Sequence, residues 1–195
     1  MKPTRVGRRI AVVGVSGSGK SYVARALAER LGILYVANDA LIWEADWKEP
    51  TPEQEYRNFD EATAGEAWVI DGNLNPKSAA DRLVLDRIDT LVWLALPRRE
   101  VWPQLLGRTV KRAATREELW HGNRESWRTS FLSKDSILWW SVKTYNHNRR
   151  RYGPWMTDAA HAHLIRVRLG SRREVRRWLK SVSALSEQGG VPDGR

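Results

Sequence analysis

The 195-residue chain contains no cysteine, which excludes both disulfides and metal sites built on thiolates. It also lacks long hydrophobic runs. The apolar stretch 10–15 is too short for the centre of a signal peptide, and no later stretch approaches the length of a membrane span. We therefore expect a cytoplasmic protein with no membrane segment. Residues 1–185 should form a single domain, and residues 186–195 should form a disordered tail.

Acidic residues are in the minority, with 23 Asp and Glu against 33 Lys and Arg, and the net charge is +10. Such an excess favours anionic partners, which include nucleotides, nucleic acids and acidic surfaces, without choosing among them. The chain has 11 tryptophans scattered along its length. We interpret most of them as core residues or pocket walls rather than as platforms on which bases stack.

Residues 14–21 read GVSGSGKS and fit the phosphate-binding pattern G-x-x-x-x-G-K-[ST] at every position. The apolar run 9–13 precedes this loop as a predicted strand, and a helical pattern follows it as far as Gly32. A chance glycine-rich turn is the alternative, and these flanking elements make it the weaker interpretation. The residues that we expect to bind the phosphates are Gly14, Ser16, Gly17, Ser18, Gly19, Lys20, Ser21 and Tyr22. The Lys20 cation would lie on the β- and γ-phosphates, and the Ser21 hydroxyl would bind Mg²⁺.

Strands and helices alternate along the chain, which predicts a three-layer α/β/α fold with a five-stranded parallel sheet. The predicted strands are 9–13, 33–36, 67–70, 90–94 and 163–167. Capping boxes that start at Thr51 and Ser171 predict two of the helices, and Ser78 and Pro97 begin two others. A further helix, 136–152, should stop at Gly153-Pro154.

Polar residues follow the predicted strands, where ligands bind in open α/β sheets. Asp71 ends an apolar strand, so it is placed to hold Mg²⁺ directly or through water, and the alternative is a carboxylate that caps a turn with Gly72. Asp39 would accept a proton or a hydrogen bond from the group being phosphorylated. Its alternative role is to cap the helical segment 40–43, and the sequence does not decide between the two.

Arginines form a second signal. Arg108 and Arg112 lie four residues apart on a helix that leads into segment 115–134, where periodicity is lost. We interpret this segment as a helical lid insertion, and we expect Arg108, Arg112 and Arg124 to stabilise the transferring phosphoryl group. The alternative is a solvated basic face. The basic cluster 146–151 reads as a solvated helix end, and the four histidines show no metal-ligand spacing.

Four segments together resemble a known family: residues 14–21, NDALIW at 38–43, WVIDGN at 68–73 and LPR at 96–98. They resemble the adenylate-kinase-like P-loop proteins often called DNA topology modulation proteins, over roughly residues 8–179. The resemblance implies a nucleoside-monophosphate-kinase-like fold with sheet order 2-3-1-4-5. It also implies that Asp71 serves Mg²⁺, that Arg108 lies on the ATP base and that Arg112 reaches the phosphates.

One departure from that family concerns the acceptor. Adenylate kinases continue Asp-Gly-Phe-Pro-Arg, whereas this chain has NLNPK at 73–77, which removes an acceptor-phosphate arginine from its expected place. Arg82 is the candidate replacement. The residues that we expect around the acceptor are Asp39, Trp43, Asp71, Asn73 and Arg82.

The function predicted from these patterns is a kinase that uses MgATP to phosphorylate a small-molecule acceptor, which could be a nucleoside, a nucleotide or a metabolite. A nucleic-acid-associated P-loop ATPase or regulator is the alternative. It ranks lower because the arginines cluster at the predicted lid, and because no helix-turn-helix or single-strand-binding pattern is evident. A nucleotide-binding protein without activity is a third hypothesis, against which the intact Lys20 and Asp71 argue. The acceptor, the choice of ATP or GTP and the oligomeric state stay open.

Overall fold

The structure of the chain, a computed structural model, describes residues 4–115, 118–123 and 137–182. For residues 113 and 137–144 it describes the backbone only. Arg124, most of the predicted lid and the predicted tail lie outside the described residues.

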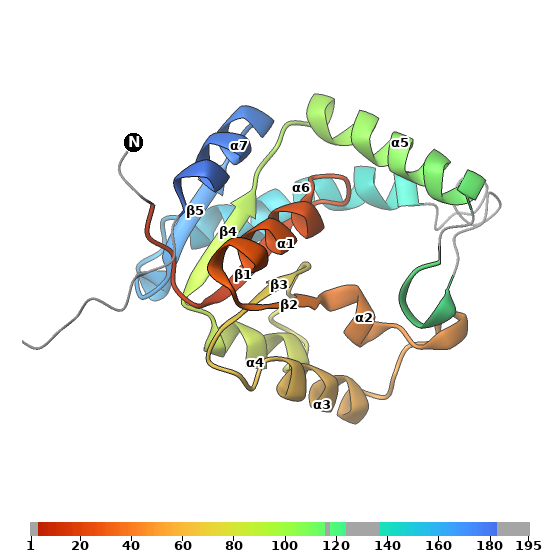
Figure 1. Cartoon of the computed structure of the whole chain (residues 1–195), viewed down its shortest axis with the longest axis horizontal. Coiled ribbons are helices and arrows are strands. Elements are labelled where there is room, and N and C mark those ends of the chain that lie inside the picture. The colour runs from red at the N-terminus through yellow and green to blue at the C-terminus, as the bar shows by residue number, and fades with distance from the viewer. Residues whose placement is uncertain (1–3, 116–117, 124–136, 183–195) are drawn as a thin grey trace, which may run out of the picture.

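Five parallel strands form the centre of the fold (Figure 1): β1 (Arg9–Gly14), β2 (Leu34–Ala37), β3 (Trp68–Asp71), β4 (Thr90–Leu94) and β5 (Ile165–Leu169). Their order in the sheet is β2-β3-β1-β4-β5, as predicted. The register pairs Val12 of β1 with Asp71 of β3 on one side and with Val92 of β4 on the other. The carboxyl ends of the three central strands therefore meet at one edge, and the phosphate loop begins there.

Helices cover both faces of the sheet (Figure 1). Helices α1 (Lys20–Leu31) and α7 (Arg172–Ser181) pack on one face, and α3 (Pro52–Ala62), α4 (Ala79–Arg87) and the end of α6 (Ile137–Trp155) pack on the other. Alternate residues of β1 face the two layers, with Ile10 and Val12 toward α1 and Ala11 and Val13 toward α3 and α4. A strand buried on both faces needs a continuous apolar run, which is why residues 9–13 were recognisable as a strand.

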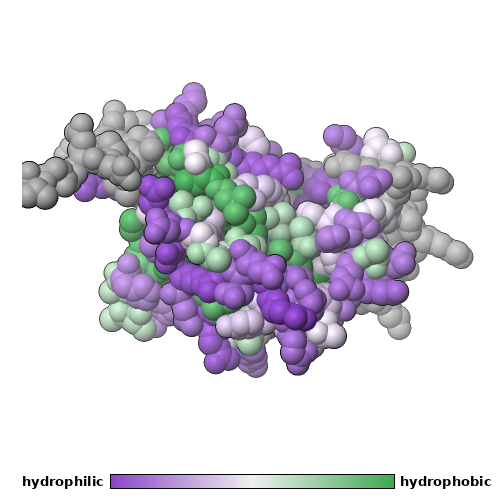
Figure 2. All heavy atoms as spheres, turned by 60° about the horizontal axis from the view of Figure 1, so that its bottom comes forward, coloured by the Kyte–Doolittle hydropathy of each residue, from purple (hydrophilic) through white to green (hydrophobic). Residues whose placement is uncertain are grey.

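The remaining elements lie at the carboxyl edge of the sheet. They are α2 (Asn38–Ile42), α5 (Arg98–Thr115) and the short 3₁₀ turns η1 (Ala45–Trp47) and η2 (Trp120–Gly122). A third 3₁₀ turn, η4 (Ala159–His161), precedes β5 and so lies at the opposite, amino edge. None of the described helices is long and apolar enough to cross a membrane. Figure 2 shows a face that is largely hydrophilic, with hydrophobic residues in a central band.

The predicted helix caps are half right. The Thr51 and Ser171 hydroxyls accept hydrogen bonds from the backbone N–H groups three residues later, as predicted. The reciprocal bonds are absent from the described hydrogen bonds: the Gln54 amide bonds to Asn58 and Arg57, and the Glu174 carboxylate accepts from the Gly170 N–H. The side chains at the third helical position thus found other partners, which the local pattern does not reveal.

The predicted start of β5 and the predicted end of α6 are wrong. Strand β5 begins at Ile165, two residues later than predicted, because His161 and Leu164 belong to a turn closed by a hydrogen bond between their backbones. Helix α6 continues through Gly153-Pro154 to Trp155. The reason is tertiary packing: the Tyr152 ring is fully buried and the Trp155 ring packs on it edge to face, at 6.1 Å between ring centroids.

Candidate functional site

The loop between β1 and α1 has the geometry of a phosphate cradle. The Ser18 N–H donates to the Val15 carbonyl (3.0 Å), which closes a tight turn. Gly17 and Gly19 have φ values of 81° and 90°, in the left-handed region that favours glycine. A Cβ on Gly17 would also lie 2.8 Å from the Cβ of Leu105, so the loop packs directly against α5.

Donors suited to an anion meet at this loop. The first-turn N–H groups of α1 have no acceptor inside the helix, and the helix dipole favours negative charge there. The Ser18 hydroxyl is buried without a hydrogen-bond partner among the described residues. The Lys20 ammonium donates to the Val15 carbonyl at 3.3 Å, a contact that a phosphate oxygen could replace. These groups fit the triphosphate of a nucleotide.

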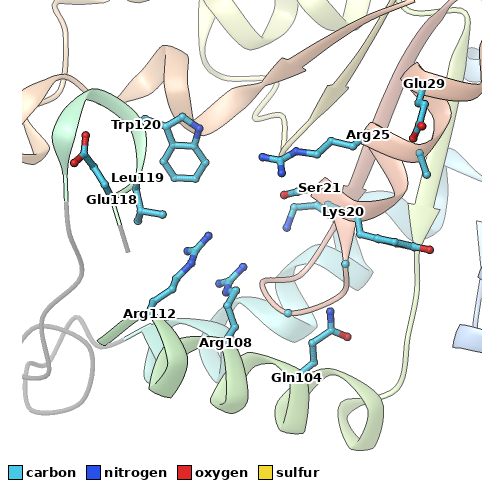
Figure 3. Close-up of a pocket in the computed structure, with 14 residues that line it drawn as sticks. Lys20, Ser21, Arg25, Glu29, Gln104, Arg108, Arg112, Glu118, Leu119 and Trp120 are labelled. Atoms are coloured by element: carbon cyan, nitrogen blue, oxygen red, sulfur yellow. The ribbon is translucent and has the colours of Figure 1, made fainter. Parts of the chain in front are cut away.

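A pocket of about 700 Å³ opens beside the loop (Figure 3). Side chains of Lys20 and Ser21 enter it from α1, and those of Arg108 and Arg112 enter it from α5 on the opposite side. The predicted residues that line it are Gly17, Gly19, Lys20, Ser21, Tyr22, Arg108 and Arg112. The structure thus brings together residues from two helices that are about ninety positions apart in the sequence.

The pocket also contains residues that were not predicted. Arg25 points into it from α1, and Trp120 faces Arg25 from the segment after α5 (Figure 3). Gln104 lines it from α5, one turn before Arg108. Arg25 could have been found, because it lies one helical turn after Ser21 and so shares its face of α1. Trp120 carried no such signal and was counted among the tryptophans of core and pocket walls.

Two carboxylates lie close enough to Lys20 to act on its charge. Burial lowers the pKa of the Lys20 ammonium, and the negative charges of Asp39 and Asp71 oppose that effect. Burial around the carboxyl group raises the pKa of Asp39. Asp39 lies in the first turn of α2, and the residue as a whole is still exposed. Asp39 does not cap this helix, because the N-cap residue is Ala37. The charges of Lys20 and of the two carboxylates therefore interact beside the phosphate cradle.

Asp71 is held by a tyrosine from the neighbouring strand. The Tyr35 hydroxyl donates to Oδ1 of Asp71 at 3.2 Å, and Asp71 is only 8% exposed. The Arg25 guanidinium lies over the Tyr35 ring, 5.1 Å from its centroid. Burial raises the pKa of Tyr35, and the negative charge of Asp71 adds to this. The hydroxyl therefore remains a donor, and it fixes the orientation of the Asp71 carboxylate.

The segment 118–123 docks on the segment that follows α2. The buried side chain of Asn123 donates to the Glu44 carbonyl (2.7 Å) and accepts from the Trp47 N–H (3.0 Å). The His121 imidazole bonds to the Ala40 carbonyl at 3.0 Å. Three non-glycine residues of these two turns, Asp46, Trp47 and His121, have positive φ. Such backbone is costly and persists where surrounding contacts hold it, so these two turns form a specific contact beside the pocket.

None of the five predicted acceptor residues is among the described residues that line the pocket: Asp39 and Asp71 lie near Lys20, and the other three are Trp43, Asn73 and Arg82. The Trp43 ring packs edge to face on Trp47 at 5.7 Å, and the Asn73 amide accepts from the Gly14 N–H at 3.2 Å, which braces the start of the loop. Arg82 is exposed on α4, and within the described part of the chain nothing joins it to the pocket. Their roles toward an acceptor stay predictions.

The donor set suits Mg²⁺. The Ser21 hydroxyl and the Asp71 carboxylate supply oxygen atoms, which this hard cation prefers. Among the described residues no group of three His, Cys, Asp or Glu side chains could form a metal site. Mg²⁺ in kinases is held by one or two protein oxygens together with phosphates and waters, so a sparse set is what it requires.

Comparison with known proteins gives a result at the level of the fold. No protein-family model matches the chain, and no curated protein matches it in sequence. Its structure is similar to that of shikimate kinase from Acinetobacter baumannii in complex with shikimate, with a TM-score of 0.52 and 18% identity over 89% of each chain. It is also similar to shikimate kinase from Bacteroides thetaiotaomicron, with a TM-score of 0.52 and 15% identity over 89% of this chain and 94% of that chain. The chain therefore has the three-layer α/β fold of P-loop kinases.

Proposed function

We propose that this chain is a kinase that binds MgATP and transfers its γ-phosphoryl group to a small-molecule acceptor, which is a nucleoside, a nucleotide or a metabolite. The observation that carries the proposal is the arrangement around Lys20. This cation lies at the phosphate loop, with Asp39 and Asp71 near it and with Arg108 and Arg112 across the same pocket.

Each of these groups has a task in phosphoryl transfer. Lys20 and the N–H groups of the loop bind the β- and γ-phosphates, and Arg108 and Arg112 neutralise charge on the phosphoryl oxygens. Ser21 and Asp71 would hold Mg²⁺, which supplies further neutralisation of the phosphates when bound. The nucleotide needs cations on several sides at once, and the pocket presents them from both α1 and α5.

Asp39 is placed to receive the acceptor's proton. An acceptor hydroxyl oxygen forms the new bond to the γ-phosphorus, the bond between that phosphorus and the bridging β–γ oxygen breaks, and ADP leaves. The hydroxyl proton passes to the Asp39 carboxylate and from there to solvent. A carboxylate whose pKa is raised is a better proton acceptor than an ordinary aspartate, and the exposure of Asp39 leaves room for a substrate.

A binding test comes before any assay of turnover. A ligand that binds only the folded state stabilises it, by about 2.7 kcal/mol at a hundredfold excess over Kd. We expect MgATP to raise the melting temperature of the wild type, and we expect Lys20→Ala to abolish the shift. Lys111→Ala, on the same helix as Arg108 and exposed, is the matched control. No shift in the wild type would overturn the proposal.

The acceptor can then be sought with the nucleotide-loaded protein. Nucleosides, nucleoside monophosphates, sugars and shikimate form a first panel, and ADP release is the readout. An acceptor that stimulates ADP release in the wild type but not in Lys20→Ala names the substrate class. A protein that binds MgATP but phosphorylates nothing in a broad panel would contradict a kinase and favour a nucleotide-binding protein without this activity.

The motifs at 14–21, 38–43, 68–73 and 96–98 support a narrower assignment, to the adenylate-kinase-like group called DNA topology modulation proteins. That name is a genetic label and specifies no reaction. Within this assignment the nucleotide is ATP, and the substitution of NLNPK for the usual acceptor-arginine segment speaks against AMP as the acceptor.

A further inference from the structure

The kinase site leaves most of the chain's positive charge unexplained. Residues 166–180 contain seven Arg or Lys against one Glu, which is a net charge of +6 out of the +10 of the whole chain. This stretch forms the edge strand β5 and helix α7. In the part of the chain that the structure describes, no residue of α7 lines the nucleotide pocket. Figure 1 shows α7 at the upper left of the molecule, on the far side of α1 from α2.

Three of these cations make contacts within the fold. The Arg166 guanidinium donates to the carbonyls of Trp155 and Asp158, and that of Arg168 lies over the Trp93 ring at 5.5 Å. Arg172 bonds to Glu100 through both its backbone and its side chain. They hold the sheet edge and the start of α7, and they need no external partner.

The other four, Arg173, Arg176, Arg177 and Lys180, are all exposed. The described hydrogen bonds, ion pairs and ring contacts include none of them. Their spacing of i, i+3, i+4 and i+7 places them within an arc of about 100°, at 100° per residue. The buried residues of the helix, Val175, Trp178 and Leu179, lie on the opposite side and fix this orientation. These four residues, the basic face of α7, therefore lie on the solvent side of the helix.

Neighbouring elements extend the basic face of α7. The Arg30 guanidinium of α1 donates to the Leu179 carbonyl at 2.6 Å, so a fifth cation lies at the end of the helix. Thr4 pairs with Val182 in a short parallel bridge, which brings the exposed Arg5 beside the same end. The sole acidic residue of α7, Glu174, is turned to the Gly170 N–H at 2.7 Å.

We propose that the basic face of α7 binds the phosphate backbone of a nucleic acid without reading its sequence. Duplex DNA carries one negative charge per about 1.7 Å of its axis, and the four cations span about 10 Å of helix, so several phosphates can be contacted at once. Arginine is suited to this because its planar guanidinium binds phosphate oxygens in pairs. The face would act as a tether, separate from the chemistry at Lys20.

The composition of the basic face of α7 argues against two other partners, a membrane surface and another protein. A helix that lies on a membrane needs apolar side chains that are free to enter the lipid, and the apolar side chains of α7 are buried in the core. The centre of a protein interface needs apolar or aromatic anchors, and the four exposed positions offer charge alone. The closely spaced phosphates of a nucleic-acid backbone match the four exposed cations.

Binding of a labelled 20-base-pair DNA duplex, measured by fluorescence anisotropy across a range of salt, tests the proposal. Four phosphate contacts predict that affinity falls about 150-fold between 50 and 200 mM salt. Removal of two contacts in Arg173→Gln/Arg177→Gln should reduce that factor to about 12-fold and weaken binding at 50 mM salt. Arg57→Gln/Lys77→Gln removes the same charge from exposed positions on the α3 and α4 side and should retain the wild-type slope.

Three outcomes would overturn the proposal. The first is that the wild type does not bind the duplex at 50 mM salt. The second is that the control variant Arg57→Gln/Lys77→Gln weakens binding as much as the α7 variant Arg173→Gln/Arg177→Gln does. The third is that vesicles containing phosphatidylserine bind the wild type more tightly than DNA does, and that the α7 variant no longer binds these vesicles. The proposal is independent of the kinase activity. The MgATP-induced rise in melting temperature should therefore be the same in the variant Arg173→Gln/Arg177→Gln and in the wild type. That measurement also shows whether the variant is folded.

Discussion

Asp81 is a buried carboxylate whose charge the fold accommodates poorly, and its replacement should stabilise the protein at neutral pH. The residue is 8% exposed, on α4, and its Oδ2 accepts from the Asn75 N–H at 2.7 Å. Burial raises the pKa of Asp81 to about 6, and the negative charge of Glu55 adds to this, whereas the Asn75 N–H and the positive charge of Arg151 oppose it.

The sign of the effect follows from the raised pKa. In the folded state Asp81 holds its proton up to about pH 6, whereas in the unfolded chain it loses the proton near its ordinary value of 3.8. Its contribution to stability is therefore complete below about pH 3.8 and is lost as the pH rises through 6. The gap between the two values corresponds to about 3 kcal/mol at pH 7.

The variant Asp81→Asn removes the charge but keeps an oxygen that can accept from the Asn75 N–H. A negative charge near the start of a helix is worth up to about 1 kcal/mol, which this substitution forfeits. We expect a net gain of about 2 kcal/mol in the free energy of unfolding at pH 7, which corresponds to a rise of roughly 4–8 °C in melting temperature for a chain of this size.

Urea unfolding of wild type and variant between pH 4 and 8 measures this. The difference between the two proteins should grow from pH 4 to about pH 6.5 and then level off. Asp86→Asn, an exposed aspartate on the same helix, controls for the loss of a surface charge and should change stability by less than about 0.5 kcal/mol. A variant that is less stable than the wild type at pH 7, or a difference that does not vary with pH, would refute the reasoning.

Three further predictions concern the site. Tyr35→Phe removes the hydroxyl that orients Asp71, so Mn²⁺ should bind the ATP-loaded protein about 10-fold more weakly in an electron paramagnetic resonance titration, with metal-free ATP binding unchanged; equal Mn²⁺ affinity would contradict this role. Asn123→Ala leaves the Trp47 N–H without its partner, so hydrogen exchange of that amide should accelerate about 10-fold or more, and an unchanged rate would show that the contact contributes little. Because the pKa of Asp39 is raised, the phosphoryl-transfer rate should fall with decreasing pH already above the range of an ordinary aspartate, and Asp39→Asn should lose both the activity and the pH dependence.

The part of the site that could be predicted from sequence is the part encoded locally. The phosphate loop needs consecutive residues of fixed type between a strand and a helix, so its pattern and its surroundings can be recognised together. The sheet order came from the resemblance, and the structure confirms it. Arg108 and Arg112 were found because two arginines one turn apart on a helix share a face, and both line the pocket.

The residues that were missed are those that meet through the register of the sheet or through tertiary contact. Tyr35 reaches Asp71 because β2 and β3 pair with Tyr35 opposite Val69, which places Asp71 diagonally across the two strands. No local pattern states this register. Trp120 enters the pocket because Asn123 docks its segment on residues 44–47, a contact between positions that are more than seventy residues apart.

The bridge between Thr4 and Val182 brings the first and the last described residues of the chain side by side. Their segments share a backbone hydrogen bond from the Thr4 N–H to the Ser181 carbonyl, and the hydroxyls of Thr4 and Ser181 lie 3.0 Å apart. During synthesis this pairing can form only after α7 has emerged from the ribosome, so the segment that leads into β1 gains this anchor later than β1 gains its pairing with β3 and β4. A circular permutant that joins the two segments with a short linker and opens the chain between α3 and β3 would reverse that order without changing which residues meet.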